Sequence, residues 1–359
     1  SCGQNTLHSN TSGSQNVAVG KQAMNSNTTG SYNVAVGHNS LYSNKAKQET
    51  TAIGYKSLYY ADDTTVAGIS YNTALGSYSL YGSTTAASNT GTSNTAVGHK
   101  TMYSNTSGSS NVAIGAQTAI HNAPLYANTT GNYNVAIGGG AMSTNVAGNQ
   151  STAIGYLAMR FANDTSTSTD TYNTALGAYS LYGSTTASAN TGIYNTAVGH
   201  SALKNNTSGS YNTTSGYYSL ASNTTGQSNT AVGQGTLQLT TTGSNNVANG
   251  QASAQSNTVG SGNSAYGHQA LMSSVAGSES TALGFYSMHY ANSSSTAFTT
   301  YNTAVGAYAL QGSTTAASNT GTKNTALGHS ALVAATSGGS NTAVGYSAGS
   351  LIAAGARNT

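Results

Sequence analysis

The sequence predicts an all-β protein, a parallel β-solenoid of about nineteen coils, each about 17–23 residues long. One phrase recurs along the chain: Asn, Thr or Val, Ala, an aliphatic residue and Gly, then two variable residues, a small residue and Leu or Met. The repeat is too short for two helices and their turns, which need about 30 residues. A unit this short cannot bury its own apolar face, so successive units stack on one another. The periodicity therefore argues against the disorder that a polar, low-complexity composition would otherwise indicate.

The period is set by the glycine of the phrase, called the motif glycine below. Of the eighteen intervals between motif glycines, eleven equal the interval from Gly3 to Gly20, and the other seven are longer by five or six residues. The nineteen motif glycines stand at positions 3, 20, 37, 54, 76, 98, 115, 138, 155, 177, 199, 216, 233, 250, 267, 284, 306, 328 and 345. They define one continuous repeat domain over residues 1–359, and nineteen coils at ~4.8 Å each would extend roughly 90 Å.

Each coil is expected to hold two short strands joined by a bend. The β-branched phrase, as at 17–19 and 34–36, is typical of a strand bounded by Asn and Gly. The small residue and Leu, as at 40–41 and 202–203, predict a second strand. The motif glycine between them lacks a Cβ and permits the bend. Turn-forming residues such as 27–31 complete the coil.

Two positions in each coil are limited in size, and each is next to a large apolar position. The residue two before the motif glycine is Ala in 17 of the 18 complete modules, Thr214 being the exception, and the third residue after it is always Ala, Ser or Thr. The residue directly before the glycine is mostly aliphatic, and the fourth after it is mostly Leu or Met. Adjacent strand residues point to opposite faces, so both faces of the strands are expected to be covered, the outer one by a second copy of the chain. The alternative, that bends turn both positions inward, stays open at this point.

A row of asparagines four residues before the motif glycine predicts an internal amide ladder. The Asn is present in sixteen of nineteen modules, and amides stacked coil over coil hydrogen-bond along the axis of stacked β structures. The other interpretation, a row that contacts glycans, is weaker. The three departures, Thr50, Ser151 and Ser280, each open a block of longer modules.

The longer modules are expected to carry surface loops, within 54–98, 115–138, 155–199 and 284–328. Asp62 and Asp63 in the first block suggest a calcium site. The third block has Asn292 and Ser293 in their places, so no shared metal site is predicted. No cofactor is predicted either.

Composition excludes several function classes. The chain has 9 Lys and Arg, 6 Asp and Glu and a net charge of +3, too little for a nucleic-acid phosphate track. No apolar run approaches the ~20 residues of a membrane-spanning helix, so no membrane insertion is expected. One cysteine excludes a disulfide framework and a Cys-based zinc site.

Candidate catalytic groups are sparse, and an enzyme is not predicted. No Ser/His/Asp set, carboxylate pair or phosphate loop is present. Five histidines directly follow motif glycines and are interpreted as surface residues: His38, His99, His200, His268 and His329. Tyrosines recur before the Asn and after the Leu, where packing over the coil edge is favoured over sugar stacking. They are Tyr32, Tyr71, Tyr133, Tyr172, Tyr194, Tyr211 and Tyr301 before the Asn, and Tyr42, Tyr59, Tyr81, Tyr103 and Tyr182 after the Leu.

The repeated phrases resemble known surface-protein repeats. Asn-Val-Ala-Val-Gly at 16–20 and Asn-Val-Ala-Ile-Gly at 111–115 resemble the head repeats of trimeric autotransporter adhesins. The longer form at 324–332 is similar to repeats of phage tail fibres and tail-fibre-type bacterial surface proteins. The resemblance implies a left-handed β-roll, usually trimeric, on a cell or virion surface, with a structural or adhesive role.

The two chain ends together restore one motif. Asn358 and Thr359, followed by Ser1, Cys2 and Gly3, reproduce the phrase, and the interval from Gly345 round to Gly3 again equals that from Gly3 to Gly20. We therefore expect an assembly junction at these five residues, with copies stacked head to tail, or one period of a longer repetitive protein. The predicted function is a structural subunit or repeat segment of an extracellular fibre, with copies of the chain as partners, end to end and side by side as a trimer. The alternative is a trimeric adhesin or tail-fibre shaft that binds a cell-surface ligand such as a glycan.

Overall fold

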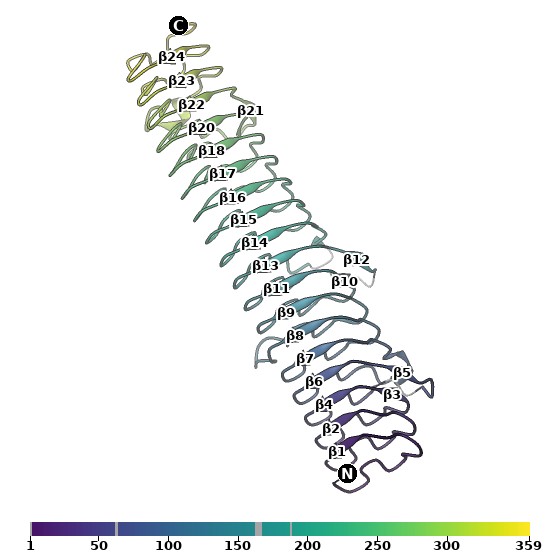
Figure 1. Ribbon diagram of the computed structural model, residues 1–359. Helices are drawn as coiled ribbons and strands as arrows, with labels where there is room; N and C mark the ends of the chain where they lie inside the picture. The colour runs from purple at the N-terminus through teal and green to yellow at the C-terminus, as the bar shows by residue number, and fades with distance from the viewer. Residues whose placement is uncertain (1, 62–63, 162–166, 187–188) are drawn as a thin grey trace. The chain divides into compact units, whose positions relative to one another are not determined.

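The computed structural model describes residues 2–61, 64–161, 167–186 and 189–359. The chain forms two compact units, residues 1–190 and 191–359. In each unit the backbone winds through successive coils, and each coil contributes one three-residue strand to a parallel sheet (Figure 1). The predicted parallel β-solenoid is confirmed.

The first unit has one such strand in each of nine coils, and neighbouring strands pair in register, as in Ala18 with Ala35. The strands are β1 (Val17–Val19), β2 (Val34–Val36), β4 (Thr51–Ile53), β6 (Thr73–Leu75), β7 (Thr95–Val97), β8 (Val112–Ile114), β9 (Val135–Ile137), β11 (Thr152–Ile154) and β13 (Thr174–Leu176).

The second unit repeats this arrangement, with Ala231 opposite Ala248 for example. Its strands are β14 (Thr196–Val198), β15 (Thr213–Ser215), β16 (Thr230–Val232), β17 (Val247–Asn249), β18 (Ser264–Tyr266), β20 (Thr281–Leu283), β22 (Thr303–Val305), β23 (Thr325–Leu327) and β24 (Thr342–Val344).

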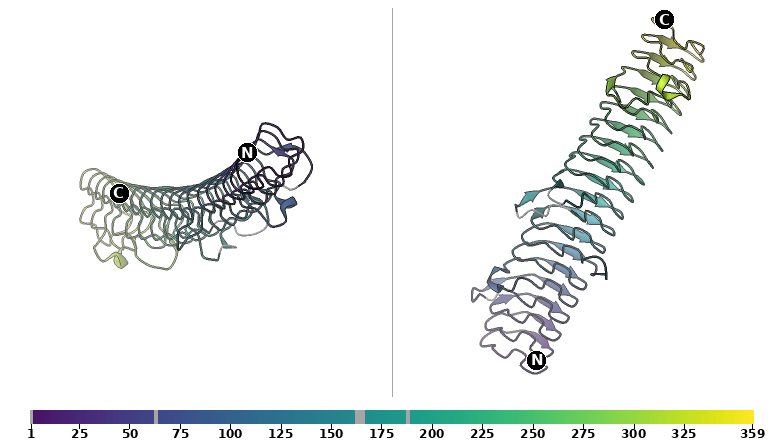
Figure 2. Two further views of the ribbon diagram at one scale, coloured as in Figure 1. Left: turned by 90° about the horizontal axis from the view of Figure 1, so that it is seen from below. Right: turned by 180° about the vertical axis from the view of Figure 1, so that it is seen from behind.

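Short additional elements mark the longer modules. Two-residue parallel pairs form at their bases, and in the part of the chain that the structure describes a turn of 3₁₀ helix is found in two of these modules. The pairs are β3 (Lys47–Gln48) with β5 (Gly68–Ile69), β10 (Gly148–Asn149) with β12 (Thr169–Asp170), and β19 (Gly277–Ser278) with β21 (Phe298–Thr299); the helices are η1 (Ala86–Ser88) and η3 (Ala316–Ser318). In the first unit strands β5 and β12 lie to the side of the stacked coils in both turned views (Figure 2).

The predicted second strand of each coil is wrong, because this segment is a series of turns. Asn39 and Leu41 have φ of 59° and 50°, so the backbone at 40–41 alternates into the left-handed region that β-strands do not use. The N–H of Leu41 still donates to the carbonyl oxygen of Ser57 in the next coil, at 2.9 Å. Residues 202–203 behave in the same way, since Ser201 and Leu203 have φ of 57° and 52°. Coil-to-coil bonding therefore continues without a second sheet.

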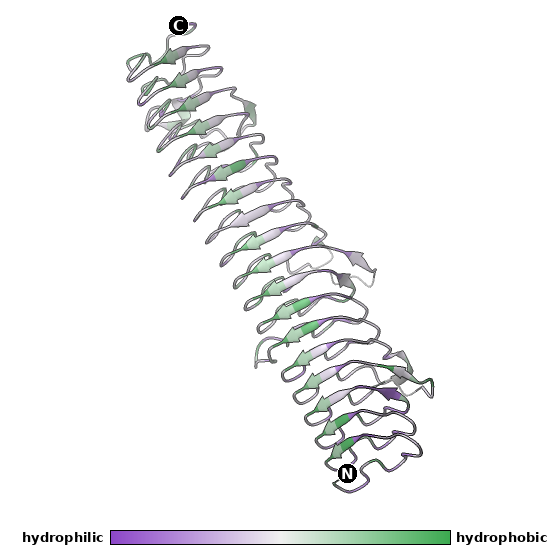
Figure 3. Cartoon of the chain, in the orientation of Figure 1, coloured by the Kyte–Doolittle hydropathy of each residue, from purple (hydrophilic) through white to green (hydrophobic). Residues whose placement is uncertain are grey.

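Burial of the side chains decides between the two alternatives for the size-limited positions, and the answer differs between the strands and the turns. In the strands, the Ala two before the motif glycine is buried while its neighbours face outward, as Ala74 between Thr73 and Leu75 shows. After the motif glycine, both positions point inward, and Ala23 and Met24 are fully buried. The strand residues thus alternate between an inner and an outer face, the outer one being exposed in the single chain, and the turn residues follow the inward interpretation. In Figure 3 the strands carry much of the apolar colour, and the connecting turns are mainly polar.

One size-limited position was assigned wrongly. The module after Gly115 was expected to place Thr118 third after the glycine. Instead, Pro124 and Leu125 take the inward places, because Met102 N–H donates to Pro124 O and Leu125 N–H donates to Ala141 O. The extra residues of this module therefore lie directly after the motif glycine, ahead of the inward pair.

Candidate assembly surfaces

The N-terminal edge continues the register of the coils. Cys2 forms a parallel bridge with Val19, and so occupies the aliphatic place directly before a motif glycine. Its N–H donates to Ala18 O at 3.0 Å, and its carbonyl oxygen accepts the N–H of Gly20 at 2.7 Å. Gly3 has φ of 129°, like the other motif glycines. Of the predicted junction residues, Cys2 and Gly3 thus take their expected places with Cys2 exposed, while Ser1 lies outside the described residues.

The C-terminal edge also keeps the repeat. Asn358 accepts the N–H of Thr342 at 2.8 Å, as the ladder asparagine does in other coils. Its own N–H and its Nδ2 both donate to Asn341 Oδ1, at 3.0 and 2.8 Å. Thr359, the next residue, is exposed. Within the described residues, β23 is the strand paired with β24, and the other side of β24 has no neighbouring strand.

The predicted amide ladder is confirmed, and its donors are mainly backbone groups. In the first unit, the N–H of Asn33 donates to Asn16 Oδ1 at 3.0 Å, and Asn33 Nδ2 donates to Lys47 O at 3.0 Å. In the second, Asn229 N–H donates to Asn212 Oδ1 at 3.0 Å. At the departures, Thr50, Ser151 and Ser280 still donate a backbone N–H to the preceding Asn, but they offer no amide oxygen to the next coil. A hydroxyl oxygen accepts the N–H of the next Asn instead, as Ser70 Oγ does from Asn72 and Thr300 Oγ1 from Asn302.

A second asparagine ladder lies seven residues after the motif glycine, and the sequence interpretation missed it. Asn27 Nδ2 donates to Asn10 Oδ1 at 2.8 Å, and Asn44 Nδ2 donates to Asn27 Oδ1 at 3.0 Å. Asn223 Nδ2 likewise donates to Asn206 Oδ1 at 2.6 Å. The signal is an Asn directly before the Thr of the turn in most coils, a pattern that is also typical of turns without a ladder.

The outer face of the strands in the first unit carries an unbroken line of aliphatic side chains, called the outer aliphatic row below. Three of its members, Val19, Leu75 and Leu176, are 42–46 % exposed. Its members are Val19, Val36, Ile53, Leu75, Val97, Ile114, Ile137, Ile154 and Leu176. In the second unit the corresponding line is broken by Ser215 and Asn249. Aligned, exposed aliphatic groups of this kind are typical of surfaces that pack on another molecule.

The five predicted surface histidines lie on the outside of the coils. Four are exposed and His268 is half-buried. Each stacks on or lies beside an aromatic ring of a neighbouring coil, as His268 does on Phe285 with ring centroids 5.3 Å apart. Among the described residues, no three His, Cys, Asp or Glu side chains gather as a metal site requires. Asp62 and Asp63, the calcium candidates, lie outside the described residues.

Five tyrosines at the place after the inward Leu or Met form a continuous stack in the first unit. Successive ring centroids are 5.0, 5.6, 4.9 and 5.3 Å apart, with interplanar angles of 6–16°. The stack comprises Tyr42, Tyr59, Tyr81, Tyr103 and Tyr126. Burial raises the pKa of Tyr59, Tyr81 and Tyr103, and neighbouring tyrosines add to the effect. These rings pack along the coil edge, as predicted for Tyr42, Tyr59, Tyr81 and Tyr103.

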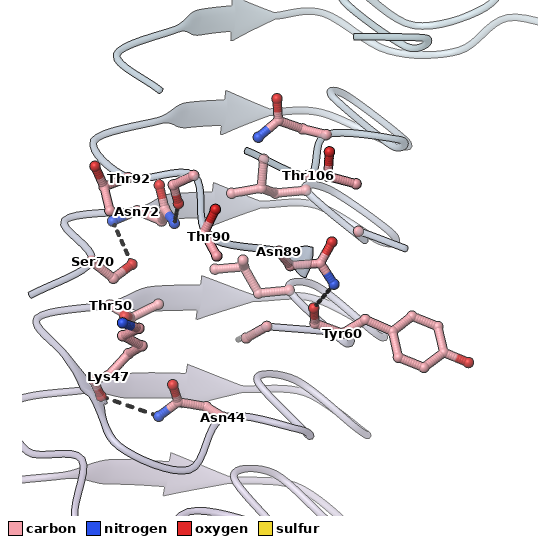
Figure 4. A pocket seen from close by; sticks show the side chains of 16 residues that line it. Asn44, Lys47, Thr50, Tyr60, Ser70, Asn72, Asn89, Thr90, Thr92 and Thr106 are labelled. Carbon is pink, nitrogen blue, oxygen red and sulfur yellow. Dashed lines mark hydrogen bonds between the residues drawn. The ribbon is translucent and has the colours of Figure 1, made fainter. Parts of the chain in front are cut away.

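A small cavity lies where the first block of long modules interrupts the second ladder (Figure 4). Its volume is about 30 Å³, room for about two water molecules. Asn44 lines it and its buried Oδ1 has no partner, because the next coil has Ala61 where an Asn would stand. The Asn89 amide donates to the carbonyl oxygen of Tyr60, whose ring points away from the cavity. A cavity of equal volume lies in the corresponding block of the second unit, beside Ala291.

Comparison with known protein families gives no match, and no curated protein matches the chain. Within the described ranges there is no helix long and apolar enough to cross a bilayer.

Proposed function

We propose that this chain is a structural segment of an extracellular fibre, in which the β-solenoid continues from one copy to the next. The observation that carries the proposal is the register of the two edges. Cys2 and Asn358 already make the hydrogen bonds of the repeat toward the interior of their own units. In a fibre, the backbone N–H and C=O groups that face outward at each edge would bond to the neighbouring copy, as the same groups bond to the next coil elsewhere in the chain. Open strand edges readily pair in this way.

The proposed junction joins Asn358 and Thr359 of one copy to Ser1, Cys2 and Gly3 of the next. These residues then occupy the five successive places of one motif. Cys2 is not buried between coils in this arrangement: it takes the outward aliphatic place of Val19, which is 42 % exposed, while Ser1 takes the inward place that Ala holds in other coils.

Side-by-side association is proposed through the outer aliphatic row, with three copies meeting there. Contact through this row would remove from water the apolar groups that the first unit leaves exposed. The resemblance to trimeric adhesin heads supports the number of copies and the location outside the cell, on a cell or virion surface.

Electron microscopy and sedimentation of the purified chain test the junction. Ser1→Asp would bury an unpaired charge at every junction, in the inward place that Ala holds in other coils, and should shorten or abolish fibres. Cys2→Val, which supplies an aliphatic residue as most coils have there, should leave fibre length unchanged. Fibres of normal length from Ser1→Asp would place the junction elsewhere, and absence of fibres from the unaltered chain would contradict the proposal.

A further inference from the structure

An open groove lies on the outside of the second unit, over three successive coils. Its volume is about 290 Å³, far larger than the small cavities beside the long modules. The groove lies at the second position after the motif glycine. One coil has Tyr218 at this position, whereas the next two coils have Gly235 and Ala252. Two small residues in a row of larger ones leave the hollow, and Tyr218 closes one end.

The wall at that end is aromatic. Tyr217 and Tyr218 lie edge to face, with ring centroids 4.5 Å apart, and Tyr217 is 52 % exposed. A tyrosine ring held in this way presents an apolar face beside a hydroxyl group. It can therefore contact the C–H groups of a ligand while hydrogen bonds form nearby.

The long sides of the groove are primary amides. Gln255 Nε2 donates to Gln238 Oε1 at 2.9 Å, and Gln251 Nε2 lies 3.5 Å from Gln234 Oε1. Each amide has two N–H donors and an oxygen with two lone pairs, so one such bond leaves every side chain able to donate and to accept. Four amides in two aligned pairs thus offer both kinds of partner along the groove.

The chemistry of the lining selects the class of ligand. None of the lining residues is charged, so nothing here would compensate a phosphate or carboxylate. An apolar ligand would leave the amides without hydrogen-bond partners. A pyranose ring combines an apolar C–H face with a rim of hydroxyl groups that donate and accept. The volume is close to the lower end of ligand pockets, about 300 Å³, which suits one or two sugar rings.

We propose that this groove binds a neutral pyranose sugar, with Tyr217 against its C–H face and Gln238, Gln251 and Gln255 on its hydroxyl groups. The site goes beyond the fibre function and lies wholly within the second unit. Its occupancy can therefore be measured whether or not the chain assembles.

Saturation-transfer NMR with the full chain tests the proposal, using the methyl glycosides of mannose, galactose, glucose and N-acetylglucosamine separately. At least one should receive saturation from the protein, with the strongest transfer to its ring C–H protons. N-acetylneuraminic acid, a charged sugar, should not bind at this groove. No transfer to any of the four neutral glycosides, or binding of the charged sugar alone, would overturn the proposal.

Two variants place the binding in the groove. Ala252→Gln should fill the groove with a larger side chain. Gln269 holds the same position in the next coil with φ of 55°, and Ala252 has φ of 54°, so the backbone tolerates the change. It should abolish the transfer, and Tyr217→Ala should weaken binding at least tenfold. Tyr211→Ala removes a tyrosine that is 56 % exposed outside the groove and should leave binding unchanged. Equal binding by all three variants would show that the sugar binds elsewhere.

Discussion

At the residue scale, the second asparagine ladder fails wherever the next coil supplies no amide. Asn44, Asn223 and Asn257 each have a buried Oδ1 without a partner. The following coil has Ala61, Thr240 or Ser274 at the corresponding place. A buried acceptor left unpaired costs about 1–3 kcal/mol. Each interruption is therefore a defined weak point in an otherwise repeating interior.

Thr240→Asn should repair one of these interruptions. The new Nδ2 can donate to Asn223 Oδ1, and the new Oδ1 can accept from Asn257 Nδ2, which now lies 3.5 Å from the Thr240 hydroxyl. The expected gain is about 1–3 kcal/mol of local stability. Hydrogen exchange of the backbone amides around residues 223–257 should slow. Thr242→Asn, at an exposed position in the same turn, should change nothing, and equal exchange in both variants would disprove the ladder's role.

Ala96→Leu tests the assignment of the strand faces. Ala96 is fully buried between coils, so a larger side chain should overpack the interior and cost about 1–3 kcal/mol. Val97→Leu, at the next residue of β7, adds bulk on the outer face, where Leu75 and Leu176 already stand, and should be nearly neutral. Thermal unfolding of the two variants makes the comparison. Similar melting temperatures would mean that the inner and outer faces have been confused.

At the element scale, backbone conformation decides which apolar residue each place accepts. The inward place four after the motif glycine has positive φ, as at Leu220 with φ of 50°. Among the described non-glycine residues with positive φ, none is Val, Ile or Thr. A β-branched side chain is strained in the left-handed region, whereas strands favour it. This explains why Leu and Met occupy the turn while Val and Ile are common in the strand.

Leu220→Ile should therefore destabilise the coil although its apolar volume is unchanged. The expected cost is about 1–3 kcal/mol from backbone strain. Leu327→Ile is the matched control, because this leucine is in strand β23 and is 45 % exposed. Urea unfolding followed by circular dichroism should separate the two variants. A neutral Leu220→Ile would mean that this place is extended after all.

The tyrosine stack predicts a loss of stability at alkaline pH. Burial raises the pKa of Tyr59, Tyr81 and Tyr103 in the folded chain above the ordinary value of 10.0. Below pH 10 the phenols are neutral in both states, and the stack stabilises the fold in full. Above it the unfolded chain ionises first, so stability falls as the pH rises toward the folded pKa values. Absorbance titration near 295 nm should show these phenols ionising late, and uniform ionisation near pH 10 with unchanged stability would contradict the prediction.

The sequence predicted the features that the period controls and missed those that depend on backbone conformation or on neighbouring coils. The strands, their register and the ladder of Asn33 and its equivalents follow from spacing alone. The turn at 40–41 was mistaken for a strand because apolar periodicity does not report the sign of φ. The absence of Val and Ile at that place was the overlooked signal. The edge residues Cys2 and Asn358 took the predicted register, whereas the groove of the second unit depends on Gly235 and Ala252 being adjacent across coils.

At the scale of the whole molecule, the proposed function depends on the stacking of equivalent coils. Each coil bonds to its neighbours through backbone groups and two asparagine ladders, so a further coil in the same register is stabilised in the same way. Few charges interrupt the surface, with 4 % of residues charged. These properties suit a long neutral fibre made of many equivalent layers.

Helical reconstruction by electron cryomicroscopy of fibres grown from the 359-residue chain tests the central claim most directly. End-to-end continuation of nineteen coils at ~4.8 Å predicts an axial repeat of roughly 90 Å, with Thr359 of one copy directly beside Ser1 of the next. A repeat unrelated to that length, or chain ends that lie apart in solvent, would contradict the account.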